Sequence, residues 1–181
     1  TKGFDVRASA RSRKYIYIFP KDLLNIDPAI PDDELLTNFR LILDCFRGSH
    51  NFHNYTTKAQ PQHSCSIRYI IDIDCELVDL KHSQNTTIGE TDDKYVQVNI
   101  HGQSFMYHQI RKMMGAAIIS HRKGWGATYI KNTMTLNKCN IFLAPSEGLY
   151  LDRILFDSYN KKSDIPGQIE TSPVVEEEIS Q

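Results

Sequence analysis

Apolar and charged side chains alternate between residues 67 and 77. The apolar set comprises Ile67, Tyr69, Ile71, Ile73, Cys75 and Leu77. The positions between them hold Arg68, Asp72, Asp74 and Glu76, and Ile70 alone breaks the pattern. This period of two predicts a long strand with one buried and one solvated face. Residues 96–100 alternate in the same way after a polar connection over 79–94, so we expect an antiparallel hairpin.

The remaining elements are predicted around this hairpin. Residues 13–19 are aromatic and β-branched, which predicts a strand with Tyr15, Tyr17 and Phe19 on one face. Pro31 and the three acids after it begin an amphipathic helix of about four turns that ends at Gly48. A further helix is expected over 128–136 and a last strand over 149–156. This order predicts an α+β fold, a mostly antiparallel sheet with helices packed on one face.

Residues 102–115 predict the central helix, which we expect to end near Gly124. One face carries Met106, Ile110, Met113 and Ala117 at helical spacing. A neighbouring stripe places Arg111 among Tyr107, Met114 and Ile118. A buried guanidinium costs several kcal/mol unless a carboxylate or phosphate pairs with it. The alternative is an arginine whose stem lines the edge of the core and whose head reaches solvent.

The charge of the chain is unevenly distributed. Its 181 residues carry a net charge of −1, yet residues 45–71 and 101–146 contain no acid. Such segregation predicts a positive face that suits a polyanion; the alternative is that folding mixes these charges in space. We expect one folded unit over residues 1–157 and an acidic, proline-containing tail over 158–181.

The cysteines and the hydropathy indicate an intracellular protein that does not enter a membrane. The four cysteines form no CxxC pair and no zinc-like spacing, so we expect free thiols. No run of about 18 apolar residues is present. Nothing in the sequence distinguishes the nucleus, the cytoplasm and the mitochondrion.

Residues 49–57 are polar, aromatic and rich in histidine. His50 and His53 have no evident third partner, so we do not expect a metal site. We expect instead a loop that presents rings and hydrogen-bonding groups to a ligand.

Recognisable motifs occur in four separated segments, over residues 4–17, 46–55, 102–115 and 144–151. Together these segments resemble the C-terminal lobe of TruA-type tRNA pseudouridine synthases, and the eukaryotic branch most. Residues 4–7 and 13–17, F-D-V-R and R-K-Y-I-Y, resemble the family's F-x-A-R and R-x-Y-x-Y. Residues 46–55, F-R-G-S-H-N-F-H-N-Y, resemble F-x-G-x-H-x-F-x-x-F. Residues 102–115 resemble G-x-x-F-L-x-x-Q/M-I/V-R-x-M-V-G, and residues 144–151 resemble A-P-x-x-G-L-x-L. The segments cover about residues 4–156 in the family's order; Val6 and Met106 are mild departures.

The resemblance implies a chemistry. The family isomerises uridine to pseudouridine in folded RNA, tRNA foremost, without a metal or cofactor. By position, Tyr15 corresponds to the tyrosine packed against the target base, and Arg111 to the arginine paired with the catalytic aspartate. The side chains that we expect to contact RNA are Arg7, Arg13, His50, His108, Arg122 and Lys123.

One departure from the family decides what this chain can do alone. The catalytic aspartate of the family lies in an R-T-D-[KA]-G motif upstream of F-x-A-R, and this sequence has no such motif. Asp5 occupies a variable position and is no substitute. We therefore expect a C-terminal lobe that is inactive alone and whose partner is the N-terminal lobe of the same protein. The alternative is a non-catalytic RNA-binding or interaction module.

Overall fold

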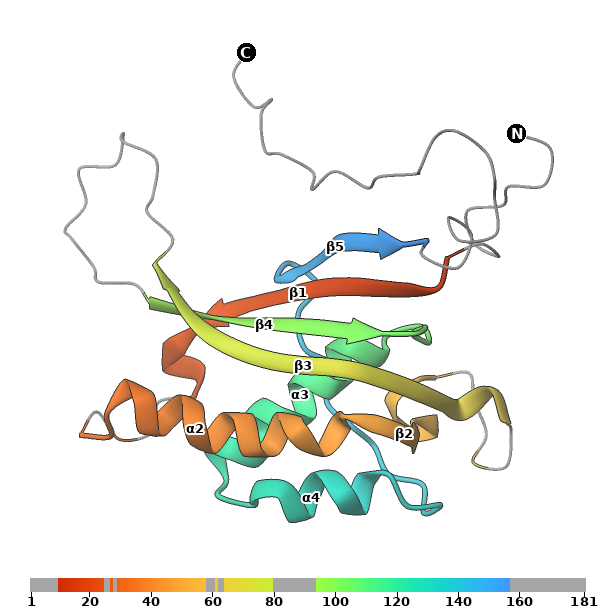
Figure 1. Cartoon of the computed structure of the whole chain (residues 1–181). Coiled ribbons are helices and arrows are strands. Elements are labelled where there is room, and N and C mark those ends of the chain that lie inside the picture. Colours follow the sequence, from red (N-terminus) through yellow and green to blue (C-terminus); the bar gives the residue numbers. More distant parts are fainter. Residues whose placement is uncertain are drawn as a thin grey trace, which may run out of the picture.

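The computed structural model confirms the predicted α+β fold. It describes residues 10–24, 27, 29–57, 61, 64–79 and 94–156, and the predicted tail over 158–181 lies outside them. A five-stranded sheet has the order β2-β3-β4-β1-β5, and every neighbouring pair in it is antiparallel (Figure 1). The strands are β1 (Ser12–Pro20), β2 (Gly48–Asn51), β3 (Ile67–Asp79), β4 (Lys94–Gly102) and β5 (Leu149–Leu155). The α-helices are α2 (Asp32–Leu43), α3 (Gln109–Arg122) and α4 (Gly126–Thr133).

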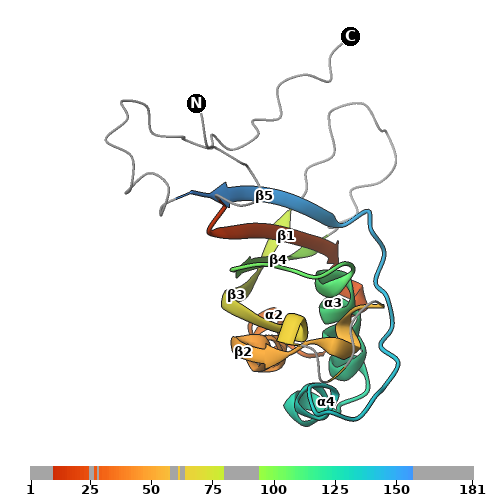
Figure 2. The ribbon, with the colours of Figure 1, turned by 90° about the vertical axis from the view of Figure 1, so that its right-hand side faces the viewer.

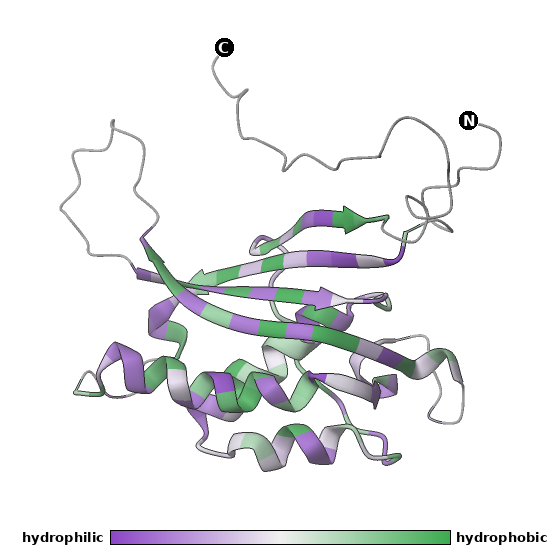
Figure 3. Cartoon of the chain, viewed as in Figure 1, coloured by the Kyte–Doolittle hydropathy of each residue, from purple (hydrophilic) through white to green (hydrophobic). Residues whose placement is uncertain are grey.

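All three helices lie on one side of the sheet (Figure 2). The alternation along the strands, visible as bands in Figure 3, points the apolar side chains toward these helices. Tyr17 and Phe19 of β1 are buried as predicted, and Tyr15 packs at the margin of the same core. The buried face is completed by Ile73, Cys75, Val96, Val98 and Ile100. Among the described helices, none combines the length and apolarity that a bilayer crossing requires.

The predicted burial pattern of β3 is wrong in its first half. Ile67, Tyr69 and Ile71 were expected in the core, but they are 52%, 48% and 37% exposed. Ile70, the residue that broke the alternation, is fully buried. The register against β4 shifts between Ile70 and Asp72, and this bulge exchanges the two faces of the strand. The predicted pattern holds after the bulge, where Ile73 is buried.

Several predicted boundaries also differ from the structure, including that of α2, which ends at Leu43 rather than at Gly48. The central helix was expected from residue 102, but β4 runs to Gly102 and α3 begins only at Gln109. The ring of Phe105 folds onto Gly102, where a Cβ would lie 2.5 Å from its Cζ atom, so the chain turns here before the helix starts. Residues 48–51, expected partly as a loop, pair with β3 as β2. The second helix covers 126–133 rather than 128–136.

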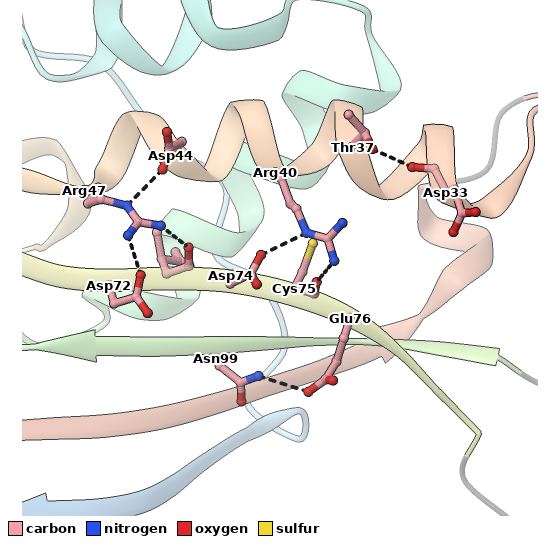
Figure 4. Close-up of polar contacts among 11 residues, drawn as sticks. Asp33, Thr37, Arg40, Asp44, Arg47, Asp72, Asp74, Cys75, Glu76 and Asn99 are labelled. Atoms are coloured by element: carbon pink, nitrogen blue, oxygen red, sulfur yellow. Dashed lines mark hydrogen bonds and ion pairs between the residues drawn. The ribbon is translucent and has the colours of Figure 1, made fainter.

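Two arginines cover the part of β3 that β2 leaves unpaired (Figure 4). Arg40 of α2 donates to the carbonyl oxygen of Cys75 and pairs with Asp74. Arg47, just before β2, donates to the carbonyl oxygen of Ile73 and pairs with Asp72. Alternate carbonyl groups of the edge are thus satisfied without another strand, which blocks edge-to-edge association. All four cysteines are free thiols, as predicted.

The bulge predicts a difference between two neighbouring isoleucines. Ile70→Ala should lower the free energy of unfolding by about 2–5 kcal/mol, since it empties a filled core site. Ile71→Ala removes the same atoms from a side chain that is 37% exposed and should cost clearly less. Urea denaturation of both variants measures the difference. Equal losses, or a larger loss at Ile71, would contradict the shifted register.

Candidate functional site: an open cleft at the start of α3

A cleft of about 300 Å³ lies between β1, the start of α3 and the start of β5. It is lined by Tyr15, by residues 105–111 and by Leu149. Tyr15 meets the ring of Phe105 edge to face, with ring centroids 5.3 Å apart. The cleft therefore joins Tyr15 and Arg111, which are 96 residues apart in the sequence. The sequence singled out both of them, and the structure brings them together.

The backbone at the start of α3 is held in an unusual conformation. His108 precedes the first helical residue with φ 65° and ψ 1°, a left-handed geometry that L-residues other than glycine rarely adopt. The Oε1 atom of buried Gln109 accepts a hydrogen bond from the Met106 amide at 2.9 Å and so closes the turn. Tyr107, 60% exposed, stacks on the His108 ring with centroids 3.7 Å apart. Strained residues of this kind cluster at functional sites.

Arg111 is half-buried and anchored by one nitrogen. Its Nε atom donates to the Ala144 carbonyl oxygen at 2.7 Å, and the Ala144 amide donates back to the Arg111 carbonyl oxygen at 3.2 Å. No carboxylate in the described part of the chain forms an ion pair with Arg111. The arginine is therefore structural through Nε, while its positive charge has no ion-pair partner among the described residues.

This charge affects two neighbouring titratable groups. Desolvation lowers the pKa of His108, and the cations Arg111 and Lys112 lower it further. Burial raises the pKa of Tyr17, against the opposing effect of Arg111. The Tyr17 phenol stays protonated and donates to the Pro145 carbonyl oxygen at 2.9 Å. This bond fixes the segment that carries Ala144 to β1.

The predicted ligand-presenting loop over 49–57 is wrong, because its rings form part of the core. Phe52 and Tyr55 are fully buried, and His53 and Asn54 are 3% exposed. The Nδ2 atom of Asn54 donates to the carbonyl oxygens of Thr133 and Asn137, and its Oδ1 accepts from the Cys139 amide. The buried Lys112 of α3 donates to the Asn54 carbonyl oxygen at 3.0 Å. This segment connects α3 to the chain that follows α4.

The side chains expected to contact RNA lie at several places. Arg13 precedes Tyr15 by two residues on β1 and so shares its face of the sheet. His50 lies on β2, at the other edge of the sheet, where its Nε2 atom contacts the Arg47 carbonyl oxygen. Arg122 and Lys123 are exposed at the far end of α3, about 17 Å along the helix from Arg111. Arg7 lies outside the described residues.

Sequence reasoning missed part of the cleft wall. Phe105, Ile110 and Leu149 supply apolar surface there, but none of them was predicted to line a cleft. Leu149 stands inside the A-P-x-x-G-L-x-L segment, which was the available signal. Within the described residues, no three His, Cys, Asp or Glu side chains are arranged to hold a metal ion.

The comparisons with known proteins agree with this geometry. The family model described as tRNA pseudouridine synthase matches residues 42–157. The chain belongs to the tRNA pseudouridine synthase family. The match includes α3 with Arg111 and the segment that leads into β5, and it ends just before the predicted tail.

Similar curated proteins come from animals and fungi. The chain is 30% identical over 170 residues to the human "Pseudouridylate synthase 1 homolog", a match over 90% of this chain. It is 38% identical over 127 residues to "tRNA pseudouridine synthase 1" of Candida glabrata and 37% identical over 127 residues to that of Saccharomyces cerevisiae. Each of these two matches covers 70% of this chain. The matched regions span 38% of the human protein and 22% of each yeast protein.

A substitution at Asn54 separates a structural role from a ligand contact. Asn54→Ala should lower the free energy of unfolding by at least about 2 kcal/mol, because unpaired buried polar groups cost ~1–3 kcal/mol each. Asn99→Ala, at an exposed asparagine on the outer face of the sheet, is the matched control and should change little. Thermal or urea unfolding measures both. If Asn54→Ala left the stability unchanged and weakened RNA binding, residues 49–57 would contact a ligand after all.

Proposed function

We propose that this chain is the C-terminal lobe of an enzyme that isomerises uridine to pseudouridine in RNA, with tRNA as the favoured substrate. One observation carries the proposal: Tyr15 and Arg111 line the same open cleft, and Arg111 has no carboxylate partner among the described residues. Membership of the family and the names of the curated relatives support it.

The cleft fits a base that has left its stack. Its volume of about 300 Å³ is at the lower end of small-ligand sites. Tyr15, backed by the edge of Phe105, offers a flat ring for a base that enters. Stacking of a base on an aromatic side chain contributes about 1–3 kcal/mol, which helps to offset the cost of flipping the nucleotide out of the RNA.

Arg111 is proposed to hold the catalytic aspartate of the missing lobe. A guanidinium beside a carboxylate lowers the carboxyl pKa and keeps it ionised at neutral pH. The aspartate then acts on the uridine as nucleophile or base: the N1–C1′ bond breaks, the C5–C1′ bond forms, and the proton of C5 is replaced by one on N1. This balance needs no oxidant or reductant. The described residues supply the ring and the cation, and the upstream lobe supplies the carboxylate.

The upstream lobe is proposed to approach the cleft beside β5. That strand ends the sheet in the described part of the chain, and its first residue, Leu149, lines the cleft. Tyr150 and Leu151 are 55% and 46% exposed, which gives this edge an apolar surface for a partner. A lobe at this position can reach Arg111 with a carboxylate and close the cleft against water.

The proposed role of Arg111 predicts a selective loss of turnover. In the longer protein that includes the upstream lobe, Arg111→Lys should lower pseudouridine formation at least about 100-fold, because lysine keeps the charge but lacks the forked donors that orient a carboxylate. RNA affinity should change little, since it is spread over many phosphate contacts. Release of tritium from 5-tritiated uridine in a tRNA transcript measures turnover, and a filter assay measures affinity.

Two controls accompany this measurement. Arg68→Lys, at an arginine of β3 outside the cleft, should retain turnover. The chain of 181 residues alone should form no pseudouridine, since it lacks the aspartate motif. Turnover by the chain alone, or normal turnover by Arg111→Lys, would refute the proposed division of roles.

RNA binding by the chain alone should depend strongly on salt. The acid-free segments predict weak binding of a tRNA transcript at 50 mM potassium chloride that falls about tenfold or more by 200 mM, because phosphate contacts release counterions. Reversing the charges of Arg122 and Lys123 together should weaken it further. Fluorescence anisotropy of labelled RNA measures both effects, and salt-independent binding would contradict a positive face.

A further inference from the structure

The turn between α3 and α4 presents the only tryptophan of the chain, Trp125, between two glycines. Gly124 and Gly126 have φ values of 65° and 58°, which disfavour any residue with a Cβ. A Cβ at either glycine would meet no atom within 4 Å. These glycines therefore set the path of the backbone and do not make room for a neighbour.

The backbone of this turn is fixed by hydrogen bonds. The Gly124 amide donates to the His121 carbonyl oxygen and the Trp125 amide to that of Ser120, each at 3.0 Å. The Ser120 hydroxyl donates to the Gly126 carbonyl oxygen at 2.8 Å. In such a helix end the residue at the position of Trp125 usually packs an apolar side chain against the last turn. Trp125 instead remains 50% exposed.

The exposed indole has an aromatic support and cationic neighbours. Tyr129, one turn further on in α4, lies with its ring centroid 4.9 Å from that of Trp125. Arg122 and Lys123 are exposed and directly precede this turn in the chain, and no acidic residue occurs from 101 to 146. The Nη1 atom of Arg122 donates to the Leu23 carbonyl oxygen at 3.2 Å, and Lys123 is the C-cap of α3. A half-exposed ring next to two cationic residues matches the surfaces on which single-stranded RNA stacks its bases.

We propose that Trp125 is a second RNA contact, on which an unpaired base of the substrate stacks while Lys123 and Arg122 bind its flanking phosphates. It lies beyond the end of α3, whose last residue is about 17 Å along the helix from Arg111, so it contacts a nucleotide other than the one in the cleft. The contact positions the folded RNA and takes no part in the chemistry. This inference rests on the proposed function, because it requires an RNA substrate.

The fluorescence of Trp125 reports on this contact directly. An unmodified tRNA transcript added to the 181-residue chain at low salt should quench the tryptophan emission, with the same midpoint as the anisotropy of labelled RNA. Trp125→Ala should weaken RNA binding about 5- to 100-fold, the range expected for the loss of one stacked base. Trp125→Phe should retain most of the affinity. Leu41→Ala, at another exposed apolar side chain, should change nothing.

The outcomes separate this inference from the proposed function. If RNA bound without quenching the tryptophan emission, and Trp125→Ala bound it as tightly as the unaltered chain, the tryptophan contact would be overturned. The proposal that this chain binds RNA would then still stand. Absence of RNA binding by every variant would overturn both. The circular dichroism and melting of Trp125→Ala should match those of the unaltered chain. If this variant unfolds, quenching and the affinity of Trp125→Phe decide the question, and an unquenched tryptophan at saturating RNA overturns the contact.

Discussion

The cleft depends on one reciprocal pair of hydrogen bonds, in which Arg111 of α3 and Ala144 each donate to the carbonyl oxygen of the other. The pair holds the segment after α4 against α3, the path that Figure 2 shows rising toward β5. Close approach continues at Gly115, where a Cβ would lie 2.3 Å from the Phe142 carbonyl oxygen. At Gly148, a Cβ would lie 2.2 Å from the carbonyl oxygen of Ile18. The path of the segment therefore requires a glycine opposite it on α3 and another within it, and it places Leu149 at the cleft.

The same interaction explains how one arginine can combine a structural role with the chemical role proposed for it. Nε is committed to the backbone, which restricts the orientation of the guanidinium in the cleft that Tyr15 and Phe105 also line. The charge remains uncompensated in the described part of the chain, a costly arrangement unless another group completes it. The sequence posed a choice between a structural arginine and one that awaits a carboxylate. The proposed function combines the two, since an anchored guanidinium would already be oriented when a carboxylate partner binds.

Much of the fold could be predicted from local patterns. The alternation of β1 and β4, and the acids after Pro31 that begin α2, are signals contained within a few residues. The predictions from sequence were wrong where contacts between residues far apart in the chain determine the structure. Burial of the 52–55 segment depends on hydrogen bonds between Asn54 and residues 133–139, and the late start of α3 depends on Phe105 closing onto Gly102. A bulge exchanges the two faces of β3. The only sign of this exchange in the sequence is Ile70, which breaks the alternation. The roles of Tyr15 and Arg111 came from the family resemblance and not from any spacing.

The central claim is that the cleft of this lobe receives an RNA base next to Arg111. The most direct measurement is a nuclear magnetic resonance titration of the ¹⁵N-labelled chain with a short uridine-containing RNA at low salt. The account predicts saturable shifts of the Arg111 Nε–H resonance and of the amides of residues 105–109 around the cleft. Shifts confined to other surfaces at saturation, with these resonances unmoved, would contradict it.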